Sequence, residues 1–259
     1  MKHAIASCSA AVLISASLAG TATAQSADEL AKKLANPIAD IISVPFQLNY
    51  TRNIGVNDDG NRFTLNVQPV IPIDLGNGWN LISRTIMPIN KNDLPGNTDS
   101  GIGDISQTFY FSPTDSGSLI WGVGPAFLLP TGADGFTADT FAAGLTGAVL
   151  TQSGNWTVGG LAVHLWDVDG PADISQTLMQ PFVTYGLGNG LSVGMNSETT
   201  YDWVNDVWTV PISATVSKVL SVNGQAMNLS GGLVYYAEAP DSGPEGLSFR
   251  LGLSLVFPK

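Results

Sequence analysis

The chain is poor in cysteine and histidine. Its 259 residues include one cysteine, Cys8, and two histidines, His3 and His164. Cys8 and His3 lie in a predicted leader, so the mature chain offers no disulfide, no thiolate metal site and no cysteine nucleophile. One remaining histidine is too few for a tight transition-metal site. We therefore expect no metal and no cofactor.

Charge is also scarce. Charged residues make up 12% of the chain, about half the share that is usual in soluble globular domains. The 21 acidic residues outnumber the 10 basic ones, which argues against nucleic acid as a partner. A soluble β-protein of this size needs a charged outer face, and this composition does not supply one.

No apolar run after residue 24 is long enough for a spanning helix. Such a helix needs about 18 apolar residues or more, so any membrane span in the mature chain must consist of strands. Residues 1–24 combine a basic start at Lys2, an apolar run over 10–18 and the small residues Ala22-Thr23-Ala24. This pattern predicts a secretory signal peptide over 1–24.

The last segment, 246–257, alternates almost without exception. The apolar face consists of Leu247, Phe249, Leu251, Leu253, Leu255 and Phe257, and the small or polar face of Ser248, Arg250, Gly252 and Ser254. A period of two predicts a strand, and these two faces suit a sheet with lipid outside and water inside. The inner strand of a soluble β-sandwich is the alternative for this segment alone. We predict that Phe257, the terminal aromatic residue, is an assembly signal for the barrel assembly machinery.

The same alternation recurs along the chain. Twelve segments show it: 42–53, 62–74, 79–90, 102–112, 119–131, 140–152, 155–167, 173–186, 191–203, 207–221, 225–238 and 246–257. Each is long enough to cross a bilayer at a tilt, which takes about 9–11 residues. Twelve is an even number, as in single-chain bacterial barrels. The fold class predicted is therefore all-β, a transmembrane antiparallel β-barrel of about 12 strands over 42–259.

The connections between these segments alternate in character. Five are short turns, four of them rich in Gly and Asn: 75–78, 113–118, 152–155, 187–190 and 222–224. Those between them are mostly longer, and together with the strand ends that flank them they hold fourteen of the 21 acidic residues. Short hairpin turns on the periplasmic side and longer loops outside are typical of bacterial outer-membrane barrels. The six tryptophans lie near strand ends, as two interfacial belts would require.

Seven prolines lie inside the predicted strands: Pro45, Pro69, Pro72, Pro88, Pro125, Pro181 and Pro211. Proline belongs at edges or bulges, and a closed barrel has no edge. We expect several of these prolines to mark bulges or bends.

The segment 25–41 precedes the first strand and has helical spacing. Leu30, Leu34, Ile38 and Ile41 recur every three to four residues, and Pro37 interrupts the pattern. We expect a short amphipathic N-terminal helix here. It could plug or cap the barrel, lie at the membrane surface, or form a loose tail.

Charged side chains on the polar phase of the strands are candidate lumen residues. If the apolar phase faces lipid, Arg84, Asp104, Glu198, Asp202 and Arg250 face inward; His164 joins them if Leu161, Val163 and Leu165 form the outer phase of its strand. One interpretation is a polar belt that constricts and selects. The other is a salt-bridge network that fills and stabilises a closed barrel.

An enzyme would need a nucleophile and a base. Twelve-stranded outer-membrane phospholipases use a Ser–His pair, but Leu165 and Trp166 follow His164 in place of the Ser and Asn expected there. Neither His-Glu-x-x-His nor Gly-x-Ser-x-Gly is present. We predict no catalytic residue and no enzymatic activity.

Several stretches carry a family resemblance: 35–37 (ANP), 43–47 (SVPFQ), 68–72 (QPVIP), 79–85 (WNLISRT), 101–105 (GIGDI), 121–125 (WGVGP), 198–203 (ETTYDW) and 257–259 (FPK). Over nearly the whole mature chain, the sequence resembles a bacterial outer-membrane family of transporters that is sometimes tied by name to the MetA pathway of phenol degradation. The resemblance implies an outer-membrane barrel of the channel type, and it carries over no catalytic or binding residues.

These observations predict a channel or transporter for small solutes, including neutral or aromatic compounds, in the bacterial outer membrane. Its expected partners are the lipid bilayer with its outer-membrane lipids, the barrel assembly machinery and the small-molecule solute. The alternative is a closed structural or surface-interaction barrel without an open pore.

Overall fold

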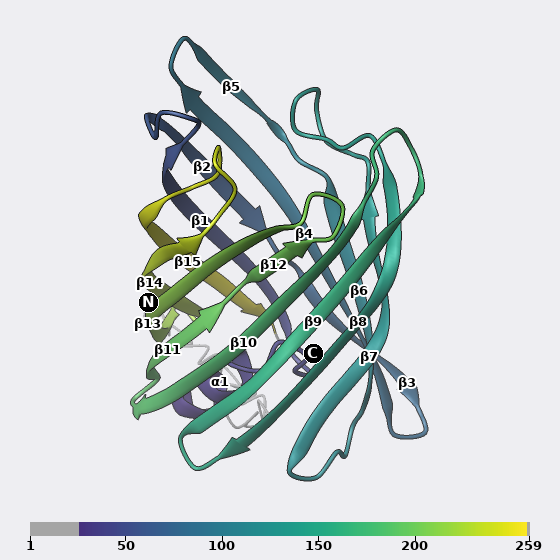
Figure 1. The fold of residues 1–259 in the computed structure, drawn as a ribbon. Helices are drawn as coiled ribbons and strands as arrows, with labels where there is room; N and C mark the ends of the chain where they lie inside the picture. The colour runs from purple at the N-terminus through teal and green to yellow at the C-terminus, as the bar shows by residue number, and fades with distance from the viewer. Residues whose placement is uncertain (1–25, 258–259) are drawn as a thin grey trace, which may run out of the picture.

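The computed structural model describes residues 26–257, so the predicted signal peptide lies outside the described residues. One helix, α1 (Ala27–Leu34), precedes fifteen strand segments. Their bounds are β1 Ile42–Ile54, β2 Gly60–Val67, β3 Val70–Gly76, β4 Trp79–Leu94, β5 Asn97–Ile102, β6 Ile105–Pro113, β7 Leu119–Leu129, β8 Phe141–Ser153, β9 Trp156–Asp169, β10 Ser175–Gly188, β11 Leu191–Ser197, β12 Thr199–Asp202, β13 Val207–Val222, β14 Gln225–Glu238 and β15 Gly246–Phe257. Figure 1 shows them wound into a tilted barrel.

The strands close into a ring of twelve crossings. Three crossings consist of two segments each, namely β2 with β3, β5 with β6, and β11 with β12. All pairings are antiparallel between chain neighbours, and β1 pairs with β15 from Ile42↔Phe257 to Tyr50↔Phe249. Each of the twelve segments predicted from the sequence overlaps one crossing, so the predicted barrel is confirmed.

The outer face is apolar and the inner face is mostly small or polar. In β15, Phe249 and Leu251 are 42% and 61% exposed, whereas Ser248 between Leu247 and Phe249 is 2% exposed. A band of exposed aliphatic and aromatic side chains is stable only where lipid is the solvent. Trp79 and Trp156 are exposed beside the short turns, and Trp166 and Trp203 beside the longer loops, which matches the two predicted belts.

Several prolines lie where the sheet is interrupted. Pro69 separates β2 from β3. The register of β13 against β14 shifts between Val210 and Pro211. Pro181 lies where β10 changes its partner from β12 to β11. A proline has no backbone N–H to donate to a neighbouring strand. Few hydrogen bonds are therefore lost when the ladder is interrupted at a proline.

The β3–β4 hairpin leaves part of one strand edge open. β3 pairs with β4 along its length, but its other neighbour, β1, is paired with it at one position among the described residues, Ser43↔Val70. The hairpin flares away from the lower rim of the barrel (Figure 1). The edge of β3 beyond Val70 is thus without a strand partner.

Helix α1 begins at a capping box. The hydroxyl of Ser26 accepts from the backbone N–H of Glu29 (3.1 Å), and the Glu29 carboxylate accepts from the N–H of Ser26 (3.2 Å). The helix ends at Leu34, earlier than Pro37, because the residue before a proline is forced out of helical geometry. Among residues 26–257 there is no helix long and apolar enough to cross a membrane.

The helix and the residues after it lie inside the lower end of the barrel (Figure 1). Leu30 is buried against Val219 and Val256 on one side of the ring. Ile38, 3% exposed, is buried among side chains of the opposite strands: Ile82, Tyr110, Ala148, Leu150 and Leu161. Of the three placements left open by the sequence, the structure therefore shows the plug.

Candidate solute pathway in the barrel lumen

A central cavity of about 280 Å³ lies in the lumen, between two walls of different polarity. Gln47 and Asn66, from β1 and β2, contribute to the polar wall, together with Gln68. Leu161, Val163, Leu165 and Leu178, from β9 and β10, form most of the apolar wall. In the ring of twelve crossings β1 and β2 lie opposite β9 and β10, so the two walls face each other.

Arg84 of β4 is the lumen cation that borders the most space. It lines the central cavity and two further cavities beside the plug. Its guanidinium donates to the amide oxygen of Gln68 at 3.3 Å. The partner that the structure gives Arg84 among residues 26–257 is thus a neutral amide.

Glu198 and Arg250 form an ion pair across the lumen side of the sheet. Two guanidinium nitrogens of Arg250 donate to the two carboxylate oxygens of Glu198 at 3.1 and 2.9 Å, and its Nε donates to Asn49 Oδ1 at 2.7 Å. The Arg250 side chain is 11% exposed and that of Glu198 31%. A bidentate pair of this kind is directional and neutralises both charges.

Regular alternation along β11 and β12 positions Glu198. It lies between β11 and β12, where the pairing of β10 passes from Met179↔Thr199 to Phe182↔Asn196. The hydroxyl of Ser197 donates to the carbonyl of Pro211 at 2.7 Å. The register against β10 is the same on both sides of this position, so Glu198 shares the inward phase of the strand with Asn196, which also lines the lumen.

Glu198→Gln is expected to destabilise the barrel by about 1–3 kcal/mol, because it leaves the Arg250 charge without its counter-ion. Arg250→Met should cost a similar amount, whereas the double variant should recover part of the loss. Urea unfolding in lipid vesicles, analysed as a double-mutant cycle, measures this coupling. Strictly additive losses would contradict an energetic role for the pair.

Two of the predicted lumen residues organise loops instead. The carboxylate of Asp104 accepts from the backbone N–H groups of Gly132 (3.0 Å) and Ala138 (2.8 Å) in the loop between β7 and β8. Asp202 accepts from the N–H groups of Val204 and Asn205 in the β12–β13 turn. Neither residue is among those that line the central cavity.

His164 lies on the outer face, and its predicted place in the lumen was wrong. Leu161, Val163 and Leu165 line the lumen, so His164 between them points outward. Its Nδ1 is 2.7 Å from the hydroxyl of Thr177, and its ring centroid is 4.1 Å from that of Trp166. The prediction assumed that the apolar phase of the strand faces lipid. It failed because this half of the lumen is itself apolar.

Arg62 is a lumen residue that was not predicted from the sequence. It shares the inward phase of β2 with Asn66, and its Nε donates to Asn92 Oδ1 at 2.6 Å. The alternation of β2 was sufficient to find it. The apolar wall was also missed, and no signal in the sequence of β9 distinguishes its inner from its outer face.

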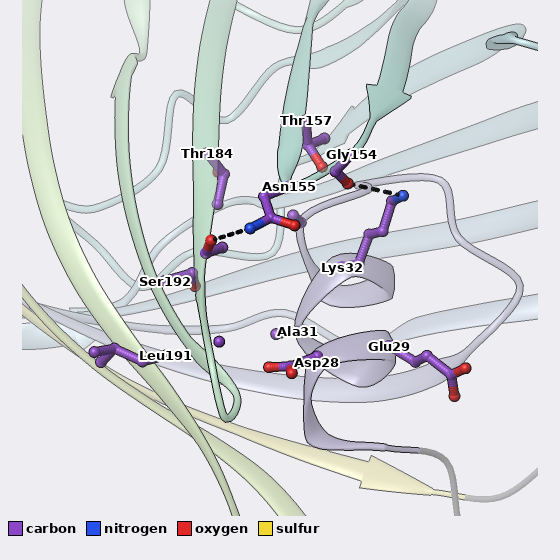
Figure 2. Close-up of a pocket in the computed structure, with 13 residues that line it drawn as sticks. Asp28, Glu29, Ala31, Lys32, Gly154, Asn155, Thr157, Thr184, Leu191 and Ser192 are labelled. Carbon is purple, nitrogen blue, oxygen red and sulfur yellow. Dashed lines mark hydrogen bonds between the residues drawn. The ribbon is translucent and has the colours of Figure 1, made fainter.

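A further cavity of about 270 Å³ lies between α1 and the wall formed by β9, β10 and β11. Figure 2 shows Lys32 of the helix extended to the β8–β9 turn, where its Nζ donates to the carbonyl of Gly154 at 3.2 Å. Gln152 returns a bond to the carbonyl of Lys32 at 2.8 Å. At the first turn of the helix, the Asp28 carboxylate accepts from the backbone N–H of Gly190 in the β10–β11 turn, so the helix is held at two turns with a cavity between it and the wall.

The cavities share walls and so form a series. Gln47, Gln68, Arg84, Gln180 and Glu198 border both the central cavity and the next one below it. Ala31, Ala35, Thr184 and Ser192 border both that cavity and the gap beside α1. The three cavities therefore lie next to one another, between the middle of the lumen and the short turns beside α1. Across the described residues no group of three or more His, Cys, Asp or Glu side chains is placed to hold a metal ion.

No family model matches the chain, and no curated protein does either. Among solved structures, the COG4313 outer membrane channel from Pseudomonas putida F1 is similar with a TM-score of 0.69 and 16% identity, over 86% of this chain and 97% of that one. Outer membrane phospholipase A from Escherichia coli has a TM-score of 0.50 and 10% identity, over 90% and 99% of the two chains. These similarities confirm the fold that the sequence resemblance implies. The chain is a β-barrel of the bacterial outer-membrane type and shares the fold of the Pseudomonas channel.

Proposed function

We propose that the protein is an outer-membrane channel for small, weakly polar solutes, including neutral and aromatic compounds. The supporting observation is the central cavity with its two opposed walls. A solute with an apolar body and one polar group can contact Leu161 and Val163 on one side and Gln47 and Gln68 on the other. Pathways for ions alone have no need of such an apolar wall.

The proposed path continues past α1 to the periplasmic side. The cavities beside the helix provide this route, because they share walls with the lumen above. Most charge along the path is balanced, since Glu198 is paired with Arg250. A neutral solute therefore meets little electrostatic penalty once it has entered.

The acidic loops at the outer mouth give the channel a weak preference for cations. Fourteen acidic residues lie in the outer connections or on the strand ends beside them, and their summed field concentrates cations within a Debye length of about 8 Å at physiological salt. The preference is expected to fade as salt rises. Reversal potentials of the purified barrel in planar bilayers measure it, and an anion preference at low salt would refute it.

Liposome swelling provides the test for neutral solutes. Benzyl alcohol is expected to enter vesicles that contain the protein faster than a sugar alcohol of similar mass, because its ring can contact the apolar wall. Empty vesicles correct for diffusion through lipid. If benzyl alcohol and the sugar alcohol enter at equal rates that do not depend on the protein, the proposal is contradicted.

One observation favours the closed barrel as a second candidate. Leu30 and Ile38 bury the plug against opposite sides of the ring, as a permanent stopper would require. Absence of conductance in the intact protein, together with high conductance after removal of α1, would support this candidate.

We assign no catalysis to the protein. The His164–Thr177 pair lies on the outer face, and the Thr177 hydroxyl already accepts from the indole N–H of Trp203 at 2.8 Å. His164 Nε2 is buried without a hydrogen-bond partner among the described residues. A general base needs a third group to orient its ring, and this histidine has none on that nitrogen.

A further inference from the structure

We propose that Arg84 and the walls around it form a binding site for small monoanions with an apolar body, such as aromatic or branched carboxylates. The site deepens the proposed function, because it lies on the same pathway and rests on it. It selects among solutes that have entered the lumen, whereas the acidic loops act on ions at the mouth.

The charge balance of the cavity points to an anion. Arg84 and Glu198 both border it, but the Glu198 carboxylate is occupied by two bonds from Arg250. Arg84 has the Gln68 amide at 3.3 Å. The charge left over in this confined space is therefore that of one guanidinium, whose planar fork of donors matches a carboxylate.

The polar neighbours of Arg84 can complete the recognition of a carboxylate. Gln47, Gln68 and Gln180 border the same cavity, and each amide has two N–H donors. The Gln68 oxygen that Arg84 now contacts can turn away when a carboxylate arrives, because an amide can present either its oxygen or its nitrogen. No further carboxylate among the residues that line the cavity competes for the guanidinium.

The apolar wall determines what kind of body the ligand can have beside its carboxylate. Leu161, Val163 and Leu178 face the polar side across the cavity, so a bound carboxylate would point its body at hydrocarbon. A volume of about 280 Å³ is near the lower end of ligand pockets, which suits a single ring or a short branched chain. A dianion would leave one charge unmatched, and a cation would meet Arg84.

Titration calorimetry of the purified, detergent-solubilised barrel tests this site with benzoate, benzyl alcohol and benzylamine. The three probes share a ring and differ in charge. Benzoate is expected to bind about tenfold tighter than the other two, as one charge-assisted hydrogen bond allows. Arg84→Gln should abolish this preference, and Arg84→Lys should retain part of it.

Lys91→Gln is the matched control, since it removes one positive charge from an exposed position near the β4–β5 hairpin and should leave benzoate binding unchanged. Heat-modifiable mobility on gels confirms that each variant is folded. Equal binding of the three probes, or benzoate binding that survives Arg84→Gln, would overturn the site. A wild-type barrel that conducts but shows no benzoate preference overturns the site alone, whereas one that conducts nothing overturns the proposed function.

Discussion

Deletion of residues 27–36 is expected to raise the single-channel conductance several-fold. This deletion removes α1 but keeps Ile38 with its buried contacts. The helix lies at the short-turn end of the lumen beside a cavity bordered by Ala31 and Ala35, so its loss should widen this part of the proposed path. Planar-bilayer recordings of both proteins measure the change. An unchanged conductance would show that the helix does not limit the flow.

A disulfide can show whether the helix moves during transport. The mature chain has no other cysteine, and Leu30 packs against Val219, so Leu30→Cys with Val219→Cys provides a single cross-link. If solutes pass beside a stationary helix, the oxidised protein should conduct like the reduced one. Conductance that appears only after reduction would mean that the helix must leave its place.

Phe257→Ser is expected to abolish assembly of the barrel, so that unfolded protein accumulates in the periplasm and is degraded. Phe257 ends β15 and pairs with Ile42, where the first and last strands meet. It is 38% exposed on the lipid side, as the proposed assembly signal requires. Outer-membrane fractionation and heat-modifiable gel mobility measure the folded fraction.

Phe249→Ser is the matched control for this substitution. Phe249 is on the same face of β15, 42% exposed, but eight residues from Phe257. Loss of lipid contact alone should affect both variants equally, whereas an assembly signal should make Phe257→Ser far more damaging. Equal yields of the two folded proteins would show that Phe257 is no signal.

Most of the fold could be predicted because the membrane imposes its rules locally. A crossing strand must alternate and must reach a given length, and a short turn carries its own chemistry in Gly and Asn. The predicted segments 225–238 and 246–257 coincide with β14 and β15. The place of α1 could not be predicted, because Leu30 and Ile38 meet partners from distant strands.

The lumen was predicted only where the two phases of a strand differ in polarity. Arg84 and Arg250 are recognisable because their strands are otherwise apolar on one phase. In β9 both phases are apolar: Val158 and Trp166 face outward, and Leu161 and Val163 inward. The alternation of β9 therefore does not show which phase faces the lumen, and His164 was predicted on the wrong face. The pairing of Glu198 with Arg250 could not be predicted, because the two residues are 52 positions apart and their strands are separated by β13 and β14.

The open edge of β3 affects whether the protein associates with other chains in a crowded compartment. A bare strand edge invites other chains to add to the sheet, which is a route to aggregation. Pro72 lies in the middle of this strand and has no N–H to offer, and Asp74 follows with a charge. Both residue types act as gatekeepers against such growth. The open edge of β3 thus contains residues that oppose self-association of the protein.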